Sequence, residues 1–146
     1  GGFILSLASD LRIVKSGKLK LGLSEVDLGV CVPSGPQILL AARTSEAHAL
    51  RVGMLGHLFD GEEALRMGYA ADCVEDARAG AVDYATRLAK KPGGGASETS
   101  RFYTEGLVDK VKAGEDKYME AFLDSWFSEM GQKCIQGLAA KLSGKA

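Results

Sequence analysis

The first nine residues, GGFILSLAS, constrain the fold of this chain more than any other segment. Two glycines lead into a run of apolar and small side chains that is long enough for a short helix and lacks a polar face. A helix without a polar face has to be buried on all sides, so it belongs inside a larger core. The polar and frayed opening that is usual at a chain terminus is missing. We therefore expect these 146 residues to be part of a longer protein.

The composition is that of one globular domain. A chain of 146 residues can bury a core, and its net charge of −1 with 25% charged residues excludes the strongly basic footprint of a nucleic-acid-binding protein. No apolar run approaches the roughly 20 residues that span a bilayer. Cys31, Cys73 and Cys134 have neither metal-ligand spacing nor the pattern of a disulfide framework. We expect them to be buried or half-buried thiols in a reducing compartment.

The sequence pattern predicts a β/α part, residues 1–92, followed by an all-helical part, residues 93–146. Thr44 or Ser45 is a candidate N-cap, and Asp60 caps a short helix that ends before Gly68. The strands are expected at 11–17, 19–30 and 69–75, and the helices at 34–55 with a break near 43–45, at 60–68 and at 76–92.

The tail combines a flexible glycine-rich joint at 93–100 with helical pattern over 97–142, broken around Ala113–Gly114. Large apolar side chains are frequent there, among them Phe102, Tyr118, Phe122, Trp126 and Phe127. This is more aromatic surface than a peripheral helical pair readily buries, so we expect the tail to mediate self-association.

Glu25 is the candidate catalytic residue, and the local pattern leaves two interpretations open. It either lies on the polar face of an edge strand or caps the next turn, or it is a carboxylate at a strand end that faces a cleft and acts as a general base. Asp27 would share its face of a regular strand, which favours the first interpretation. Gly1 and Gly2 similarly form a tight turn, or present a backbone N–H that stabilises developing negative charge at a helix N-terminus.

Other candidate motifs are weaker. Residues 93–95 form no phosphate loop, because no Lys-Ser/Thr follows and no strand precedes them. His48 is expected on a helix surface and His57 in a loop, and neither has metal-ligand or triad partners in the sequence. No nucleophile elbow is present.

Taken in order, three segments resemble the enoyl-CoA hydratase/isomerase (crotonase) family. GGFILSLASDLRIV resembles the family's glycine loop, buried helix and following strand. LGLSEVDLGVCVPSG is similar to F-G-x-P-E-x-x-L-G-x-x-P-x-x-G, and LFDGEEALRMGYAADCVED resembles x-x-x-A-x-E-A-x-x-x-G-L-V-x-x-V. The resemblance implies an α/β fold, in which a partial superhelix of β-β-α turns is followed by a helical oligomerisation module.

The resemblance also implies acyl-CoA chemistry. Two backbone N–H groups stabilise the enolate of a thioester while a carboxylate moves the proton. Gly1 stands at the position of one of these N–H groups, and Glu25 stands at the catalytic glutamate. Gly2, Ile4, Pro33 and Lys141 are assigned to substrate or CoA binding.

Two differences from hydratases favour a Δ3,Δ2-enoyl-CoA isomerase. Hydratases carry a second glutamate on the buried helix, and that position is Ile4 here. Ser24 replaces the proline that hydratases place before the catalytic glutamate. The alternatives are a hydratase or another acyl-CoA enzyme of the family, or a non-catalytic helical assembly module.

The same resemblance gives the expected partners. The substrate is an acyl-CoA, coenzyme A enters as part of it, and no separate cofactor or metal is expected. The assembly is expected to be a trimer or a hexamer, with no nucleic-acid or membrane partner. The expected location is the cytoplasm, or the peroxisomal or mitochondrial matrix of a eukaryote. The second oxyanion N–H lies upstream in the family, so we expect little activity from residues 1–146 alone.

Overall fold

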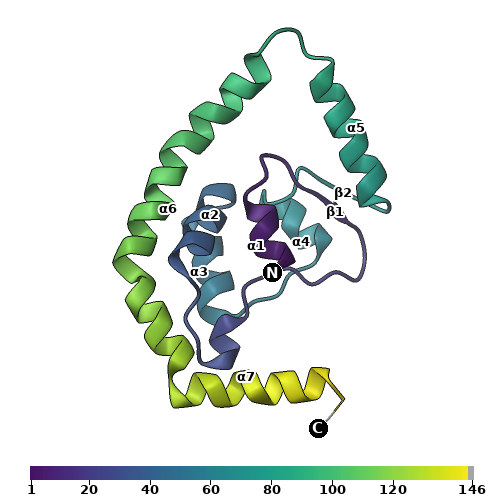
Figure 1. Cartoon of the computed structure of the whole chain (residues 1–146). Helices are drawn as coiled ribbons and strands as arrows, with labels where there is room; N and C mark the ends of the chain where they lie inside the picture. The colour runs from purple at the N-terminus through teal and green to yellow at the C-terminus, as the bar shows by residue number, and fades with distance from the viewer. Residues whose placement is uncertain (145–146) are drawn as a thin grey trace.

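The computed structural model describes residues 1–144 and confirms an α/β body followed by long helices (Figure 1). Helices α5, α6 and α7 frame the body, and α6 runs along one side of it. The elements in chain order are α1 (Gly2–Leu7), β1 (Ile13–Lys15), the 3-10 helix η1 (Glu25–Leu28), α2 (Ser34–Arg43), α3 (Glu46–Leu55), α4 (Gly61–Arg66), β2 (Asp72–Val74), α5 (Ala77–Ala89), α6 (Gly95–Phe127) and α7 (Glu129–Leu142).

Strands β1 and β2 form a parallel pair in which Ile13 lies opposite Asp72. Helices α4 and α5 both pack on this pair. Two glycines allow α4 and α5 to lie close to the strands. A Cβ at Gly61 of α4 would lie 2.4 Å from the Lys15 carbonyl oxygen, and one at Gly80 of α5 would lie 3.0 Å from side-chain atoms of Ile13. Larger residues at these positions would push the helices off the sheet.

The core lies between α1, α2, α3 and α4. Its largest fully buried side chains are Tyr69, Phe59, Leu7, Leu23, Leu40, Val30 and Val52. Phe3, Phe59 and Tyr69 form an aromatic cluster in which the Phe59 and Tyr69 rings meet edge to face, with centroids 5.8 Å apart. Edge-to-face pairs of this kind stabilise a core beyond their buried area.

The capping signals of the sequence are confirmed. The Ser45 side chain accepts a hydrogen bond from the His48 N–H and starts α3, so the break predicted near 43–45 is present. Asp60 accepts from the Glu63 N–H at 2.8 Å at the start of α4. Gly68, just beyond the end of α4, adopts a left-handed φ of 74°.

The strand predicted at 19–30 is wrong. Leu21 makes a single antiparallel bridge to Phe59, and Glu25–Leu28 forms η1 instead. Gly22 explains part of this, because its φ of 152° and the His57 carbonyl oxygen 2.7 Å from a would-be Cβ interrupt a regular strand. Within the described residues, α1 is buried on one side only. Leu7 is fully buried, whereas Leu5 is 76% exposed.

The tail departs from the sequence prediction in two places. Helix α6 begins at Gly95, inside the predicted joint, and continues unbroken through Ala113–Gly114. Gly114 is buried, and a Cβ there would lie 2.6 Å from Ile38 of α2, so this glycine allows helix packing and does not end a helix. The break occurs at Ser128, whose extended backbone separates α6 from α7.

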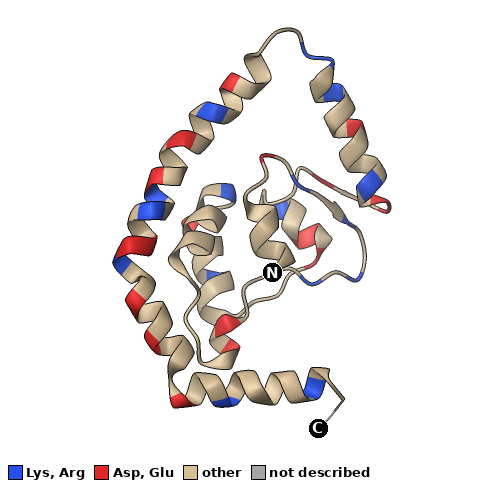
Figure 2. Cartoon of the chain, in the orientation of Figure 1, with Lys and Arg blue, Asp and Glu red and all other residues tan. Residues whose placement is uncertain are grey.

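The three cysteines differ in exposure, and the helices differ in charge. Cys31 is exposed, against the expectation of burial, while Cys73 and Cys134 are half-buried. Acidic and basic residues are interspersed along α6, whereas α1 has neither (Figure 2). Although α6 has 33 residues, no helix within residues 1–144 is long and apolar enough to cross a membrane.

Candidate active site

Glu25 is the first residue of η1 and has a buried carboxylate oxygen. Its Oε2 is shielded from solvent and has no hydrogen-bond partner among the residues that the structure describes. A buried polar atom without a partner costs folding free energy, about 1–3 kcal/mol. A fold keeps such an atom where a function requires it, so Glu25 is the strongest candidate for a reactive group in the described chain.

The backbone around Glu25 is held by short-range hydrogen bonds. The Glu25 carbonyl accepts from the N–H groups of Gly29 and Val30, the latter at 3.1 Å. Gly29 adopts a left-handed φ of 70°, which ends η1. Helices α3 and α7 both pack against η1. The carboxylate is therefore presented by a tight turn and not by a strand end.

Asp27 does not share a face with Glu25. Residues two apart in a 3-10 helix point in different directions, because each residue turns by about 120°. The exposed Asp27 carboxylate lies against the backbone of Gly56 at the end of α3, 2.9 Å from a would-be Cβ. Asp27 therefore gives no support to the interpretation of Glu25 as a residue on the polar face of an edge strand.

Gly1, Gly2 and Ile4 are brought together at the start of α1. Gly1 is the N-cap residue, and its carbonyl accepts from the Leu5 N–H at 3.1 Å. A Cβ at Gly1 or Gly2 would have no neighbour within 4 Å among the described residues. Ile4 is half-buried and packs against the hydrophobic core.

Pro33 and Lys141 lie elsewhere. Pro33 is the N-cap residue of α2, after the Glu25 turn. Lys141 is in the last turn of α7, and α7 meets η1 in its first turn, where Gly131 lies 3.9 Å from a would-be Cβ at Gly29. At 1.5 Å per residue, Lys141 lies about 15 Å farther along α7 than Gly131. The structure thus does not bring Lys141 to this contact.

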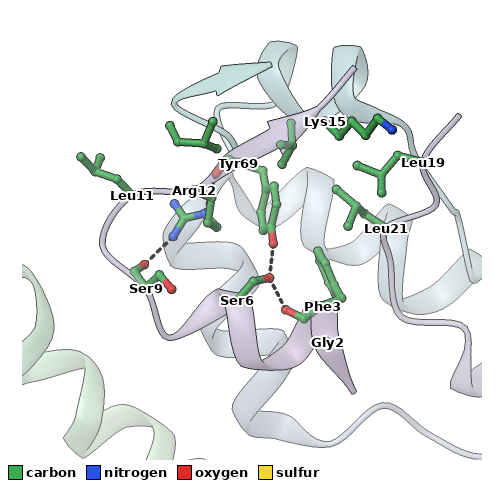
Figure 3. A pocket seen from close by; sticks show the side chains of 12 residues that line it. Gly2, Phe3, Ser6, Ser9, Leu11, Arg12, Lys15, Leu19, Leu21 and Tyr69 are labelled. Atoms are coloured by element: carbon green, nitrogen blue, oxygen red, sulfur yellow. Dashed lines mark hydrogen bonds between the residues drawn. The ribbon is translucent and has the colours of Figure 1, made fainter. Parts of the chain in front are cut away.

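A pocket of about 370 Å³ opens beside α1 and contains polar groups that the sequence did not single out (Figure 3). The hydroxyl groups of Ser6 and Tyr69 point toward each other and share a hydrogen bond. Arg12 donates to the Tyr69 carbonyl at 2.6 Å and to the Ser9 carbonyl at 2.5 Å. Gly2 also lines this pocket. Ser6 and Tyr69 are 63 residues apart, so no local sequence pattern predicts their hydrogen bond.

Burial changes the pKa values of two groups in this pocket. It raises the pKa of Tyr69 above its usual 10.0, although the Ser6 hydrogen bond and the Arg12 charge act in the opposite direction. Burial and the nearby Arg43 charge lower the pKa of Arg12 below its usual value. Tyr69 is therefore a neutral hydrogen-bond donor at physiological pH.

His57 has a partner that sequence reasoning missed. It lies in a loop, as expected, and its Nε2 donates to both oxygens of Glu63, at 2.9 and 3.1 Å. Arg51 donates to the same carboxylate at 2.8 Å. Burial raises the pKa of Glu63, but the hydrogen bonds and charges of His57 and Arg51 outweigh it, so the pKa lies below 4.5. No three His, Cys, Asp or Glu residues within 1–144 are grouped so that they could hold a metal ion.

Comparison with known proteins places this geometry in a family. The family model described as enoyl-CoA hydratase/isomerase matches residues 1–140. The chain is 32% identical over 91 residues to enoyl-CoA delta isomerase 2, peroxisomal, of Arabidopsis thaliana, covering 62% of this chain and 38% of that protein. It is 36% identical over 75 residues to (E)-benzylidenesuccinyl-CoA hydratase of Thauera aromatica, covering 51% and 29%.

Solved structures show the same fold. Human mitochondrial delta3-delta2-enoyl-CoA isomerase superposes with a TM-score of 0.85 at 23% identity, covering 99% of this chain and 57% of that one. Carnitinyl-CoA hydratase of Mycobacterium avium superposes with a TM-score of 0.80 at 26% identity, covering 97% and 56%. The chain thus spans a little over half of these structures and 29–38% of the two curated relatives. It belongs to the enoyl-CoA hydratase/isomerase family.

Proposed function

We propose that this chain carries the proton-transfer site of an enoyl-CoA isomerase, with Glu25 as the acid–base residue. The observation that carries the proposal is the buried and unpartnered Oε2 of Glu25. A carboxylate without protein partners is free to take up a proton from a substrate carbon. The named similarity to a plant enoyl-CoA delta isomerase supports the same reaction class.

The proposed reaction moves one double bond and leaves the enzyme unchanged. Glu25 removes a proton from the α-carbon of a 3-enoyl thioester, and the electron pair of that C–H bond forms the enolate. The enolate collapses as the γ-carbon takes the proton from the Glu25 carboxylic acid, which gives the 2-enoyl thioester. In the full-length protein, where the Gly1 nitrogen is part of a peptide bond, Gly1 at the start of α1 supplies one backbone N–H to the enolate oxygen, and hydrogen-bond donors there stabilise the developing charge.

The apolar character of α1 supports isomerisation over hydration. No acidic residue occurs in Gly2–Leu7, and Ile4 packs against the core. Water addition in this family uses a second carboxylate on that helix, and one carboxylate suffices to move a proton between two carbons. Hydration is the second candidate, because a hydratase is also among the named relatives.

We assign substrate binding to the backbone of Gly2, to Ile4 and to Pro33, with coenzyme A as part of the substrate. We assign Lys141, in the last turn of α7, to a contact with the CoA that forms away from the Glu25 turn. We also propose assembly into a trimer or hexamer. Exposed aromatic side chains support it: Phe102, Tyr103 and Phe127 of α6 are 72%, 75% and 69% exposed.

The test compares Glu25→Gln with Asp27→Asn in the full-length protein. Glutamine keeps the shape of the side chain but cannot accept the proton, so we expect isomerisation of 3-enoyl-CoA to fall by about 10²–10⁴. Asp27→Asn changes an exposed carboxylate on the same turn and should leave the rate unchanged. Full activity of Glu25→Gln would overturn the role of the carboxylate. Efficient hydration of 2-enoyl-CoA by the wild type would favour the hydratase instead.

A further inference from the structure

The corner between α6 and α7 is fixed by side-chain hydrogen bonds. The Ser128 hydroxyl donates to the Ser125 carbonyl at 2.8 Å and accepts from the Gly131 N–H at 3.0 Å. The Gln132 amide donates to the Trp126 carbonyl at 2.8 Å. Gly131 is buried, and a Cβ there would lie 2.6 Å from the Ser125 carbonyl oxygen. These bonds leave the corner little freedom to open.

The same corner contacts the end of the Glu25 turn. A Cβ at Gly29 would lie 3.4 Å from the Met130 side chain. Two residues later, the Cys31 N–H donates to the Ser125 hydroxyl at 3.1 Å, across 94 residues of sequence. The Ser125 hydroxyl donates its own proton to the Phe122 carbonyl at 2.8 Å, so its lone pairs are available to Cys31.

A short path joins this contact to Glu25. Cys31 follows Val30, whose side chain is 2% exposed and whose N–H donates to the Glu25 carbonyl at 3.1 Å. The hydrogen bond to Ser125 thus holds the Val30–Cys31 peptide unit in place. The Val30 N–H in turn holds the carbonyl of Glu25, the first residue of η1. In the remainder of the turn, Gly29 bonds to the same Glu25 carbonyl.

We propose that Ser125 is a positioning residue that sets the orientation of the Glu25 turn for proton transfer. The proposal rests on the function proposed for Glu25. Cys31 is exposed, so water replaces the lost acceptor when Ser125 is truncated, and the cost in stability is small. The cost in rate is larger, because a displacement of about 1 Å at a reacting group lowers a rate by up to about 10². Helix α6 thereby acts on the reaction without touching the substrate.

The experiment uses the full-length protein with Ser125→Ala, Ser125→Thr and the control Thr104→Ala. The Thr104 hydroxyl bonds to the Ser100 carbonyl within α6 and so reports the loss of a hydroxyl from the same helix. We expect Ser125→Ala to lower kcat on 3-enoyl-CoA by about 10- to 100-fold with KM within a factor of about two. Ser125→Thr restores kcat because it keeps the acceptor, and Thr104→Ala resembles the wild type.

Amide hydrogen exchange gives a second readout that does not depend on turnover. Exchange at Val30 and Cys31 should be faster in Ser125→Ala and unchanged in Thr104→Ala. Wild-type kcat and exchange in Ser125→Ala, with Glu25→Gln inactive, would overturn this inference and leave the proposed function intact. Wild-type activity of Glu25→Gln would remove both. If Ser125→Thr and Thr104→Ala both lowered kcat as much as Ser125→Ala does, the loss of rate would reflect a general effect on α6. That result would also overturn the inference.

Discussion

The Tyr69 hydroxyl donates a hydrogen bond to the Ser6 hydroxyl, 63 residues earlier in the chain. The direction follows from Ser6, whose own proton goes to the Phe3 carbonyl at 2.6 Å. The Arg12 guanidinium lies over the same tyrosine, 5.0 Å from the ring centroid. These contacts hold helix α1, at whose start the glycines of the candidate site lie, against the segment that follows α4.

This hydrogen bond predicts an unequal pair of substitutions. Ser6→Ala leaves the hydroxyl of the 1% exposed Tyr69 without a partner and should cost about 1–3 kcal/mol of unfolding free energy. Tyr69→Phe removes that hydroxyl and should cost about 1 kcal/mol. The double variant should lose less than the sum. Urea denaturation measures all three, and Thr86→Ala on the exposed side of α5 is the control. Strict additivity would contradict the contact.

Glu63 predicts a dependence of stability on pH. Its pKa in the folded chain lies below 4.5, because the hydrogen bonds and charges of His57 and Arg51 outweigh burial. A lowered pKa means that the carboxylate stabilises the fold above about pH 4.5 and loses this contribution as the pH falls through the folded value. Glu63→Gln should cost about 0.5–1 kcal/mol at pH 7 and flatten the acid limb of the stability curve.

The control for the Glu63 variant is a second ion pair, Glu98–Arg101, in which the distance between nitrogen and oxygen is the same. Glu98 accepts from Arg101 at 2.8 Å, but both side chains are more than half exposed, at 56% and 58%, against 20% for Glu63. Glu98→Gln should therefore leave the stability curve almost unchanged at physiological salt. Chemical denaturation between pH 3 and pH 7 distinguishes the two. An equal effect of both variants would mean that the shielding of Glu63 has no energetic role.

Two helical glycines predict opposite effects of the same substitution. A Cβ at Gly61 would lie 2.4 Å from the Lys15 carbonyl oxygen, so Gly61→Ala should separate α4 from β1 and cost about 1–3 kcal/mol. A Cβ at Gly106 in α6 meets no atom within 4 Å, so Gly106→Ala should stabilise by about 0.5–1 kcal/mol through helix propensity. Thermal unfolding measures both signs. A neutral Gly61→Ala would mean that α4 does not need its close approach.

Ile4→Glu tests why the start of α1 is apolar. Ile4 is half-buried against the core, so a carboxylate there should lower the unfolding free energy, by about 1–3 kcal/mol. It also restores the second carboxylate that hydratases of the family carry, and should add weak hydration of 2-enoyl-CoA. Ile4→Gln is the matched control, since it brings the same bulk without the charge. Unchanged stability and no hydration would contradict both expectations.

The sequence could predict elements whose ends are set by neighbouring residues. Asp60 and Ser45 cap helices through bonds to N–H groups three residues away, so their signal is local. The turn around Glu25 could not be predicted in this way. Its alternating apolar pattern is typical of a strand, and the contacts of Gly22 with the His57 region interrupt it. Gly114 was misinterpreted for the same reason, because its partner Ile38 lies in another helix.

The residues of the candidate site also divide into those with a local sequence signal and those without one. Glu25 could be proposed from the sequence because the residues that accompany it form a recognisable local segment. Ser125 gave no signal, since its role depends on a contact with Cys31 across 94 residues. The Ser6–Tyr69 bond was missed for an equivalent reason. Positions that act through distant backbone groups require the fold.

The pairing of β1 with β2 has a consequence for the order of folding. Ile13 lies opposite Asp72, so the two three-residue strands close a loop of roughly 60 residues for a few hydrogen bonds. The entropy lost in that closure exceeds what so short a ladder returns, whereas α2, α3 and α4 form from nearby residues. We expect the helical hairpins to collapse first and the strands to pair late, which makes the β1–β2 contact a reporter of the final folding step.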